Sequence, residues 1–140
     1  MIAVIGQYLV RLVDRRNAHT DLVSEQCAQL ISLEEDLRNR VWEERRLGLR
    51  DVVSAWPIAE YLLAEARLKI ACRDIELHDA LRGMQAAGHE LGRTWRQDLP
   101  DDAEVEEAWL RHREALDRLI TASGAVAAKA DEKPWRRSLH

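Results

Sequence analysis

The sequence predicts an all-α protein, folded as an antiparallel four-helix bundle-like arrangement with a long N-terminal helix. Apolar residues recur at steps of three and four along most of the chain, which is typical of amphipathic helices. No run alternates apolar with polar residues in the way that a half-buried strand does. The three prolines stand at positions 57, 100 and 134, each where the helical pattern breaks, and short connections favour antiparallel neighbours.

Length and charge bound the class of protein. A chain of 140 residues is expected to form one domain. Its 46% apolar and 33% charged residues are typical of a folded, well-solvated protein. The formal net charge is −4, and the basic residues form no cluster strong enough to attract a phosphate backbone. We therefore expect no nucleic-acid partner.

The first predicted helix runs to about Leu47, and Gly48 is the expected stop because glycine readily adopts the left-handed conformation that ends helices. Its second half carries an apolar stripe formed by Val23, Cys27, Leu30, Leu37 and Val41. Residues 14–21 (DRRNAHTD) contain no large apolar side chain. This stretch either projects from the bundle as a polar stalk or breaks the helix, in which case Thr20 or Asp21 would cap a fresh start.

The second predicted helix begins near Ser54, with Ser54 as N-cap and Pro57 in the first turn, where a missing N–H costs nothing. Its predicted buried face consists of Ile58, Tyr61, Leu62, Leu68 and Cys72. The apolar pattern then shifts by about two residues, which predicts a break near Arg73–Asp74 and makes Asp74 the cap of a third helix. A single kinked helix is the alternative.

The third predicted helix carries the apolar stripe Leu77, Leu81, Met84, Leu91 and Trp95. It also contains Gly83, Gly88 and Gly92, although a glycine inside a helix is unfavourable relative to alanine. Gly88 lies on the stripe, so it predicts either a close approach of another backbone or a weak, locally frayed helix.

The fourth predicted helix has the strongest start signal in the chain. Asp101 is the expected N-cap, and Glu104 three residues later completes a capping box. The helix then carries the regularly spaced stripe Val105, Trp109, His112, Leu116, Leu119, Ile120, Ser123 and Val126. It is expected to fade near Lys129, ahead of a polar tail.

The opening stretch MIAVIGQYLV is almost wholly apolar and is followed by Arg11, Arg15 and Arg16. A helix here would be apolar on most sides, and each exposed Ile, Leu or Val forgoes roughly 1.5–3 kcal/mol of burial. The rest of the bundle, a second copy, another protein or a bilayer surface must therefore cover it.

We expect three segments: an apolar helical segment over residues 1–16, a helical bundle over 20–129 and a polar tail over 130–140. The predicted function is a non-enzymatic interaction or assembly module, in which the N-terminal helix mediates self-association or docks another protein. The predicted interaction residues are Ile5, Leu9, Leu12, Val13 and Trp135.

Membrane association is the alternative for the opening stretch. Its arginines follow the apolar run instead of preceding it, unlike a secretory signal. As a helix it reaches only about 20 Å, against about 30 Å for a bilayer core. Residues 1–13 would then lie on a membrane surface or belong to an anchor completed upstream. We expect a cytoplasmic protein, with the membrane face as its alternative position.

No pattern typical of catalysis, cofactor binding or metal binding occurs: Glu-x-x-His, H-E-x-x-H, G-x-S-x-G and phosphate-loop spacings are all absent from the sequence. We expect no enzyme activity, cofactor or metal. His112 and His78 are expected to be core-edge imidazoles, each with one hydrogen bond, and Asp74 is the candidate partner of His78. A small-molecule-binding bundle that uses both histidines is the alternative.

The remaining histidines and the cysteines are expected to be structural. His19 and His89 stand at ordinary exposed positions. Cys27 and Cys72 lie far apart on apolar helical faces, where cysteine behaves as a small hydrophobic residue. Two buried, reduced thiols suit a reducing compartment.

Overall fold

The computed structural model describes the backbone of residues 2–95 and 101–131, and side chains at 19, 21–95 and 101–129. Four helices account for most of this part of the chain: α1 (Ile2–Arg46), α2 (Ile58–Ala71), α3 (Ile75–Trp95) and α4 (Asp102–Asp131). The described residues form no strand. The protein therefore has the all-α, bundle-like fold that the sequence predicts.

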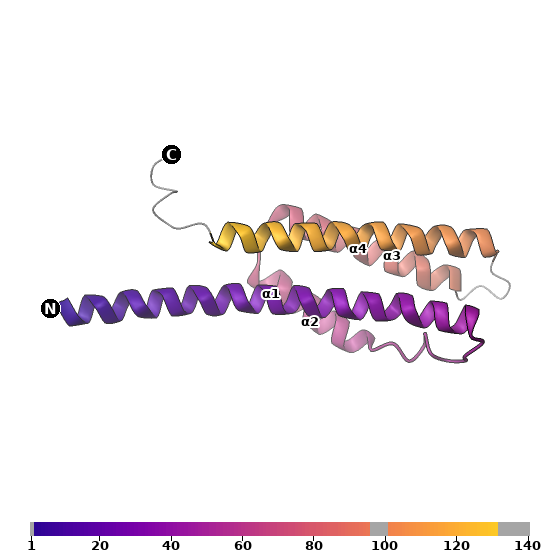
Figure 1. Cartoon of the computed structure of the whole chain (residues 1–140), viewed down its shortest axis with the longest axis horizontal. Helices are drawn as coiled ribbons and strands as arrows, with labels where there is room; N and C mark the ends of the chain where they lie inside the picture. Colours follow the sequence, from indigo (N-terminus) through magenta and orange to yellow (C-terminus); the bar gives the residue numbers. More distant parts are fainter. Residues whose placement is uncertain (1, 96–100, 132–140) are drawn as a thin grey trace.

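The helices run alternately up and down (Figure 1). α2 packs on α1, α3 packs on α4, and contacts between α1 and α4 join the two pairs. The N-terminal part of α1 extends past the end of α4, beyond the described parts of the other helices (Figure 1).

α1 is one continuous helix from Ile2 to Arg46. It passes through residues 14–21 without interruption, so the predicted alternative of a break capped by Thr20 or Asp21 is wrong. At its other end the prediction is confirmed: the helix stops just before Gly48, whose φ of +69° lies in the left-handed region that glycine tolerates.

The start and the face of α2 differ from the prediction. The N-cap is Pro57, because the Ser54 hydroxyl instead donates to the carbonyl of Asp51. Ile58 and Leu62 are 58% and 51% exposed. The buried face of the helix consists of Tyr61, Ala64, Glu65 and Leu68.

The loop of residues 47–57 explains why α2 turns a different face to the core than its apolar pattern predicts. Three hydrogen bonds hold this loop against α1. Arg40 donates to the carbonyl of Val52 at 2.9 Å, and the Val53 amide donates to Glu44 at 2.8 Å. The Trp56 indole donates to the carbonyl of Leu33 at 2.8 Å. The loop thereby fixes the angle at which the chain enters α2, and this angle overrides the local apolar pattern.

The predicted N-caps of α3 and α4 are confirmed, whereas no hydrogen bond among the described residues joins the Asp101 amide to Glu104 to complete the predicted capping box. The Leu77 amide donates to Asp74 Oδ1 at 3.0 Å, and residues 72–74 are not helical, so the kinked single helix is wrong. The Ala103 amide donates to Asp101 Oδ1 at 3.1 Å. α4 continues to Asp131, slightly past the predicted end.

One hydrophobic core draws on all four helices. Its fully or almost fully buried members include Leu30, Leu68, Leu77, Leu81, Met84 and Leu119. A smaller cluster of Val41, Leu91 and Ala108 lies where the C-terminal part of α1 meets α3 and α4. The predicted apolar stripes supply most of these residues, although Ile120 is 42% exposed.

The glycines of α3 do not mark a tight backbone crossing. A Cβ atom added at Gly83 or Gly92 would meet nothing within 4 Å. At Gly88 it would meet the Glu34 carboxylate oxygens at 3.7 Å, which is ordinary van der Waals contact. The neighbour of Gly88 is therefore the buried side chain of Glu34.

Candidate functional site

A carboxylate and an imidazole are paired inside the bundle. Glu34 on α1 and His112 on α4 are 2% and 0% exposed, and Glu34 Oε2 lies 2.7 Å from His112 Nε2. An ionised carboxylate can only accept hydrogen bonds, so the imidazole donates its Nε2–H. The two side chains thus link α1 to α4 across the core.

The other imidazole nitrogen is left without a partner. His112 Nδ1 is buried and has no hydrogen-bond partner among the described residues. An unpartnered buried polar atom is unfavourable, so the core contains a polar site that the bundle itself does not satisfy.

Tyr61 and Glu65 extend this polar cluster along α2. Both are buried, and the Tyr61 hydroxyl lies beside the carboxylates of Glu34 and Glu65. Neither Tyr61 Oη nor Glu65 Oε2 makes a hydrogen bond of good geometry with another described residue. The other carboxylate oxygen of Glu65 accepts from Lys69 Nζ at 2.7 Å. Burial raises the pKa of Tyr61, and the negative charges of Glu34 and Glu65 raise it further. The hydroxyl therefore stays protonated.

Two members of the cluster form the floor of a groove. A hollow of about 730 Å³ lies between α2 and α3, and Glu34 and Tyr61 line it from inside the bundle. Trp56, Leu62 and Trp95 are among its apolar lining residues, and the Trp56 and Tyr61 ring centroids lie 5.2 Å apart. We call this hollow the α2–α3 groove.

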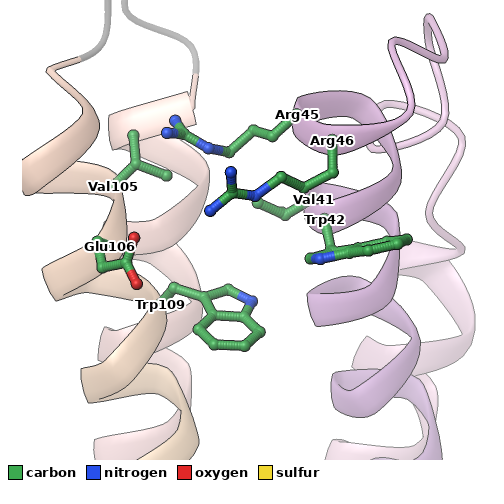
Figure 2. A pocket seen from close by; sticks show the side chains of 7 residues that line it. All are labelled: Val41, Trp42, Arg45, Arg46, Val105, Glu106 and Trp109. Atoms are coloured by element: carbon green, nitrogen blue, oxygen red, sulfur yellow. The ribbon is translucent and has the colours of Figure 1, made fainter.

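A second, smaller hollow of about 150 Å³ lies between the C-terminal end of α1 and the start of α4. Figure 2 shows both arginines reaching from α1 across the gap: Arg45 extends toward Val105 at the start of α4, and Arg46 extends toward Glu106 and Trp109. Arg45 is partly buried and pairs with Asp102. The hollow is small beside typical ligand pockets, which measure roughly 300–1,000 Å³.

The indole of Trp109 is already engaged beside that hollow. The Arg38 guanidinium carbon lies 3.9 Å from the centroid of the Trp109 ring, and Arg38 also donates to the Trp109 carbonyl at 2.6 Å. These contacts join α1 to α4 and favour a structural role for the region.

The side chains of the predicted interaction residues lie outside the part of the chain that the structure describes. Ile5, Leu9, Leu12 and Val13 belong to the continuous helix α1, but their side chains lie outside the described residues, as does Trp135 altogether. Their predicted role therefore stays a prediction.

His112 and His78 each form a hydrogen bond, and the two bonds lie in different parts of the molecule. His112 has the single bond that was expected, but it lies deep in the core and not at its edge. His78 Nε2 pairs with the carbonyl of Cys72, whereas the Asp74 carboxylate binds the Leu77 amide and Lys129. The predicted bond between the Asp74 carboxylate and the His78 imidazole is thus wrong, and His89 and His19 are exposed as expected.

Both cysteines behave as the sequence predicts. Cys27 and Cys72 are buried free thiols. Burial raises the pKa of Cys27, which lowers the fraction of reactive thiolate.

The sequence contained a signal for Glu34 and Glu65 that the apolar stripes concealed. Glu34 stands four residues after Leu30 and three before Leu37, so it lies on the stripe of α1 itself. Glu65 holds the corresponding place between Tyr61 and Leu68. A carboxylate on an apolar stripe is rarely buried without a reason.

Within the described residues, no group of three or more His, Cys, Asp or Glu side chains is arranged to hold a metal ion. In the same part of the chain, no helix has the length and apolarity needed to cross a membrane. Comparisons with protein-family models, with curated proteins and with solved structures gave no match to this chain.

Proposed function

We propose that this protein is a non-enzymatic, cytoplasmic interaction module whose apolar N-terminal helix mediates self-association or docks another protein. The observation that carries the proposal is the course of α1. It is one unbroken helix, and its apolar first turns extend beyond the described parts of the other three helices (Figure 1). Among the residues whose side chains the structure describes, the first buried one in α1 is Val23.

The energetic argument rests on the sequence of that extension. Residues 2–13 include Ile2, Val4, Ile5, Leu9, Val10, Leu12 and Val13. Burying even a few of these side chains in a contact contributes several kcal/mol, at roughly 1.5–3 kcal/mol each. A second copy or a partner helix would supply such a contact through the shared face of Ile5, Leu9 and Leu12.

Replacing Leu9 with Asp in the full-length chain tests this proposal. A carboxylate placed in an apolar contact is strongly unfavourable, so the variant should lose self-association or partner binding. Its thermal melt should stay close to that of the wild type, because the described core lies further along the helix. Light scattering coupled to size-exclusion chromatography measures the assembly, and circular dichroism follows the melt.

Leu116→Asp is the matched control, since Leu116 is buried in the main core. This variant should unfold the domain. If Leu9→Asp melts the domain to the same degree, the segment is part of the core. A wild type that remains monomeric at every concentration would argue against self-association and leave docking to another protein as the form to test.

Membrane attachment is the second candidate, and the positions of Arg11, Arg15 and Arg16 after the apolar run favour it. Arginines flanking an apolar helix can contact anionic headgroups while the helix lies in the interface. Flotation with anionic vesicles tests this function. Wild type that co-floats, with a Leu9→Asp variant that does not, would favour the membrane over a protein partner.

A further inference from the structure

We propose that the α2–α3 groove binds a small organic ammonium ion with an apolar body, and that the Glu34 carboxylate anchors its charged group. The proposal concerns a different part of the molecule from the N-terminal segment. It rests on the shape of the groove, on the charges that line it and on the unpaired polar atoms at its floor.

The shape suits a small molecule. The groove measures about 730 Å³, within the roughly 300–1,000 Å³ of typical ligand sites. Trp56 and Trp95 offer aromatic surface, and the Trp56 ring is held in place by its bond to the Leu33 carbonyl. Gly92 lines the groove with open space where a side chain would stand.

The lining charges favour a cation. Three lining residues are carboxylates, namely Glu34, Glu44 and Asp51. The lining guanidinium, Arg93, is paired with Glu90 of the same helix at 2.7 Å, and the lining imidazole of His89 is exposed. The three carboxylates outnumber the one guanidinium of the lining, so an anionic ligand would meet net repulsion and an ammonium ion net attraction.

The floor lacks the hydrogen-bond donors that an ammonium group carries. Glu34 is buried and is bonded to His112. Tyr61 Oη and Glu65 Oε2 are buried and make no hydrogen bond of good geometry with the described residues, although the Tyr61 hydroxyl lies beside the carboxylates of Glu34 and Glu65. An ammonium group could donate hydrogen bonds to the Glu34 carboxylate and to Tyr61 Oη. The Tyr61 hydroxyl could then donate its own hydrogen to the carboxylate of Glu34 or Glu65.

Two other ligand classes fit less well. A metal ion would need a set of ligating side chains that the described residues do not assemble. A wholly apolar ligand would cover Glu34 and Tyr61 without supplying a hydrogen bond, which makes their burial more costly. An amphipathic ammonium ion can pack its apolar body against the aromatic lining residues and donate hydrogen bonds to Glu34 and Tyr61.

The experiment compares three probes of similar shape on the full-length protein: phenethylamine, neutral 2-phenylethanol and anionic 3-phenylpropionate. Isothermal titration calorimetry measures affinity, and tryptophan fluorescence reports on the groove through Trp56 and Trp95. We expect saturable binding of phenethylamine at one site. The alcohol should bind at least tenfold more weakly, and the carboxylate should not bind.

Two variants locate the site. Glu34→Gln keeps the size of the side chain but removes its charge, so phenethylamine affinity should fall at least tenfold. Gly92→Leu fills open space in the groove without altering any charge and should abolish binding while leaving the helix intact. Glu25→Gln removes an exposed carboxylate from α1 outside the groove, and its affinity should equal that of the wild type.

Several results would overturn the proposal. These are the absence of saturable phenethylamine binding at millimolar concentration, equal affinity for the alcohol, or unchanged binding in Gly92→Leu. If Glu34→Gln does not fold, Gly92→Leu and the comparison of amine with alcohol still decide between a charged anchor and none. Assembly of the wild type is measured separately, so failure here leaves the N-terminal proposal untouched.

Discussion

At the scale of single residues, the Glu34–His112 pair is the feature most at odds with a plain hydrophobic core. Both side chains are almost completely buried, and one 2.7 Å hydrogen bond joins them. Buried charged groups seldom add net stability compared with well-packed apolar residues. The pair is therefore better explained by a use for the carboxylate than by stability of the bundle.

We predict that His112→Leu lowers the free energy of unfolding by about 3–5 kcal/mol, because it leaves the Glu34 carboxylate buried without its donor. The double variant Glu34→Leu/His112→Leu should recover most of this loss. Urea denaturation of the two variants and the wild type measures the difference. A double variant that is less stable than His112→Leu would contradict the prediction.

Asp74 makes stability depend on pH. The hydrogen bond from the Leu77 amide, followed by that from Lys129, lowers the pKa of Asp74 in the folded state. Its contribution is thus fully present above the ordinary aspartate pKa near 3.9 and is lost as pH falls through the lowered value. Thermal melts between pH 5 and about 2 should show a smaller loss of stability in Asp74→Asn than in the wild type.

The control for this experiment is Asp21→Asn, which changes an exposed aspartate on α1. We expect its pH dependence to follow that of the wild type. Identical acid curves for Asp74→Asn and the wild type would mean that the cap does not contribute to acid unfolding.

At the scale of elements, the sequence predicts helix ends better than helix faces. Asp74, Asp101 and Gly48 were identified correctly because capping is local: each acts on amides or carbonyls within a few residues. The face of α2 was predicted only in part: Tyr61, Leu68 and Cys72 are buried as expected, whereas Ile58 and Leu62 are apolar but exposed. Their exposure follows from the loop bonded to α1, which no local pattern encodes.

Buried charge in the candidate site is equally non-local. Glu34 meets His112, a residue 78 positions away, so its burial depends on how α1 and α4 are placed. The sequence indicated His112 as a core-edge residue with one hydrogen bond, but neither its complete burial nor its partner. The groove itself depends on the placement of α2 relative to α3 and was not predicted.

Replacing Gly83 in α3 or Gly48 after α1 with alanine should change the free energy of unfolding in opposite directions. Gly83→Ala should stabilise the protein by about 0.5–1 kcal/mol, since Gly83 is inside α3 and an added Cβ meets nothing. Gly48→Ala should destabilise it by about 1–2 kcal/mol, because φ is +69° there. Chemical denaturation measures both, and changes of the same sign would contradict this reasoning.

At the scale of the whole molecule, the pairing of helices explains why the groove exists. α1 packs on α2, α3 packs on α4, and α1 contacts α4. The side where α2 and α3 face each other is therefore the least closely packed. It is there that the buried carboxylate of Glu34 comes near the surface.

We predict that a chain of residues 20–140 keeps the cooperative melt of the full-length protein, with a Tm change below about 5 °C, which corresponds to roughly 1 kcal/mol in a domain of this size. The reason is that the described buried core starts at Val23. Differential scanning calorimetry measures the transition. A loss of cooperativity on truncation would show that the first segment helps to hold the bundle together.

The continuity of α1 also sets the direction in which an assembly would grow. Position 9 precedes Cys27 by 27 − 9 = 18 residues, which is about five full turns at 3.6 residues per turn. The two positions therefore fall on the same side of the helix, and at Cys27 that side faces the main core. A copy bound around position 9 would continue the bundle along its axis. The resulting dimer would therefore be elongated along this axis, with nearly the same cross-section as the monomer.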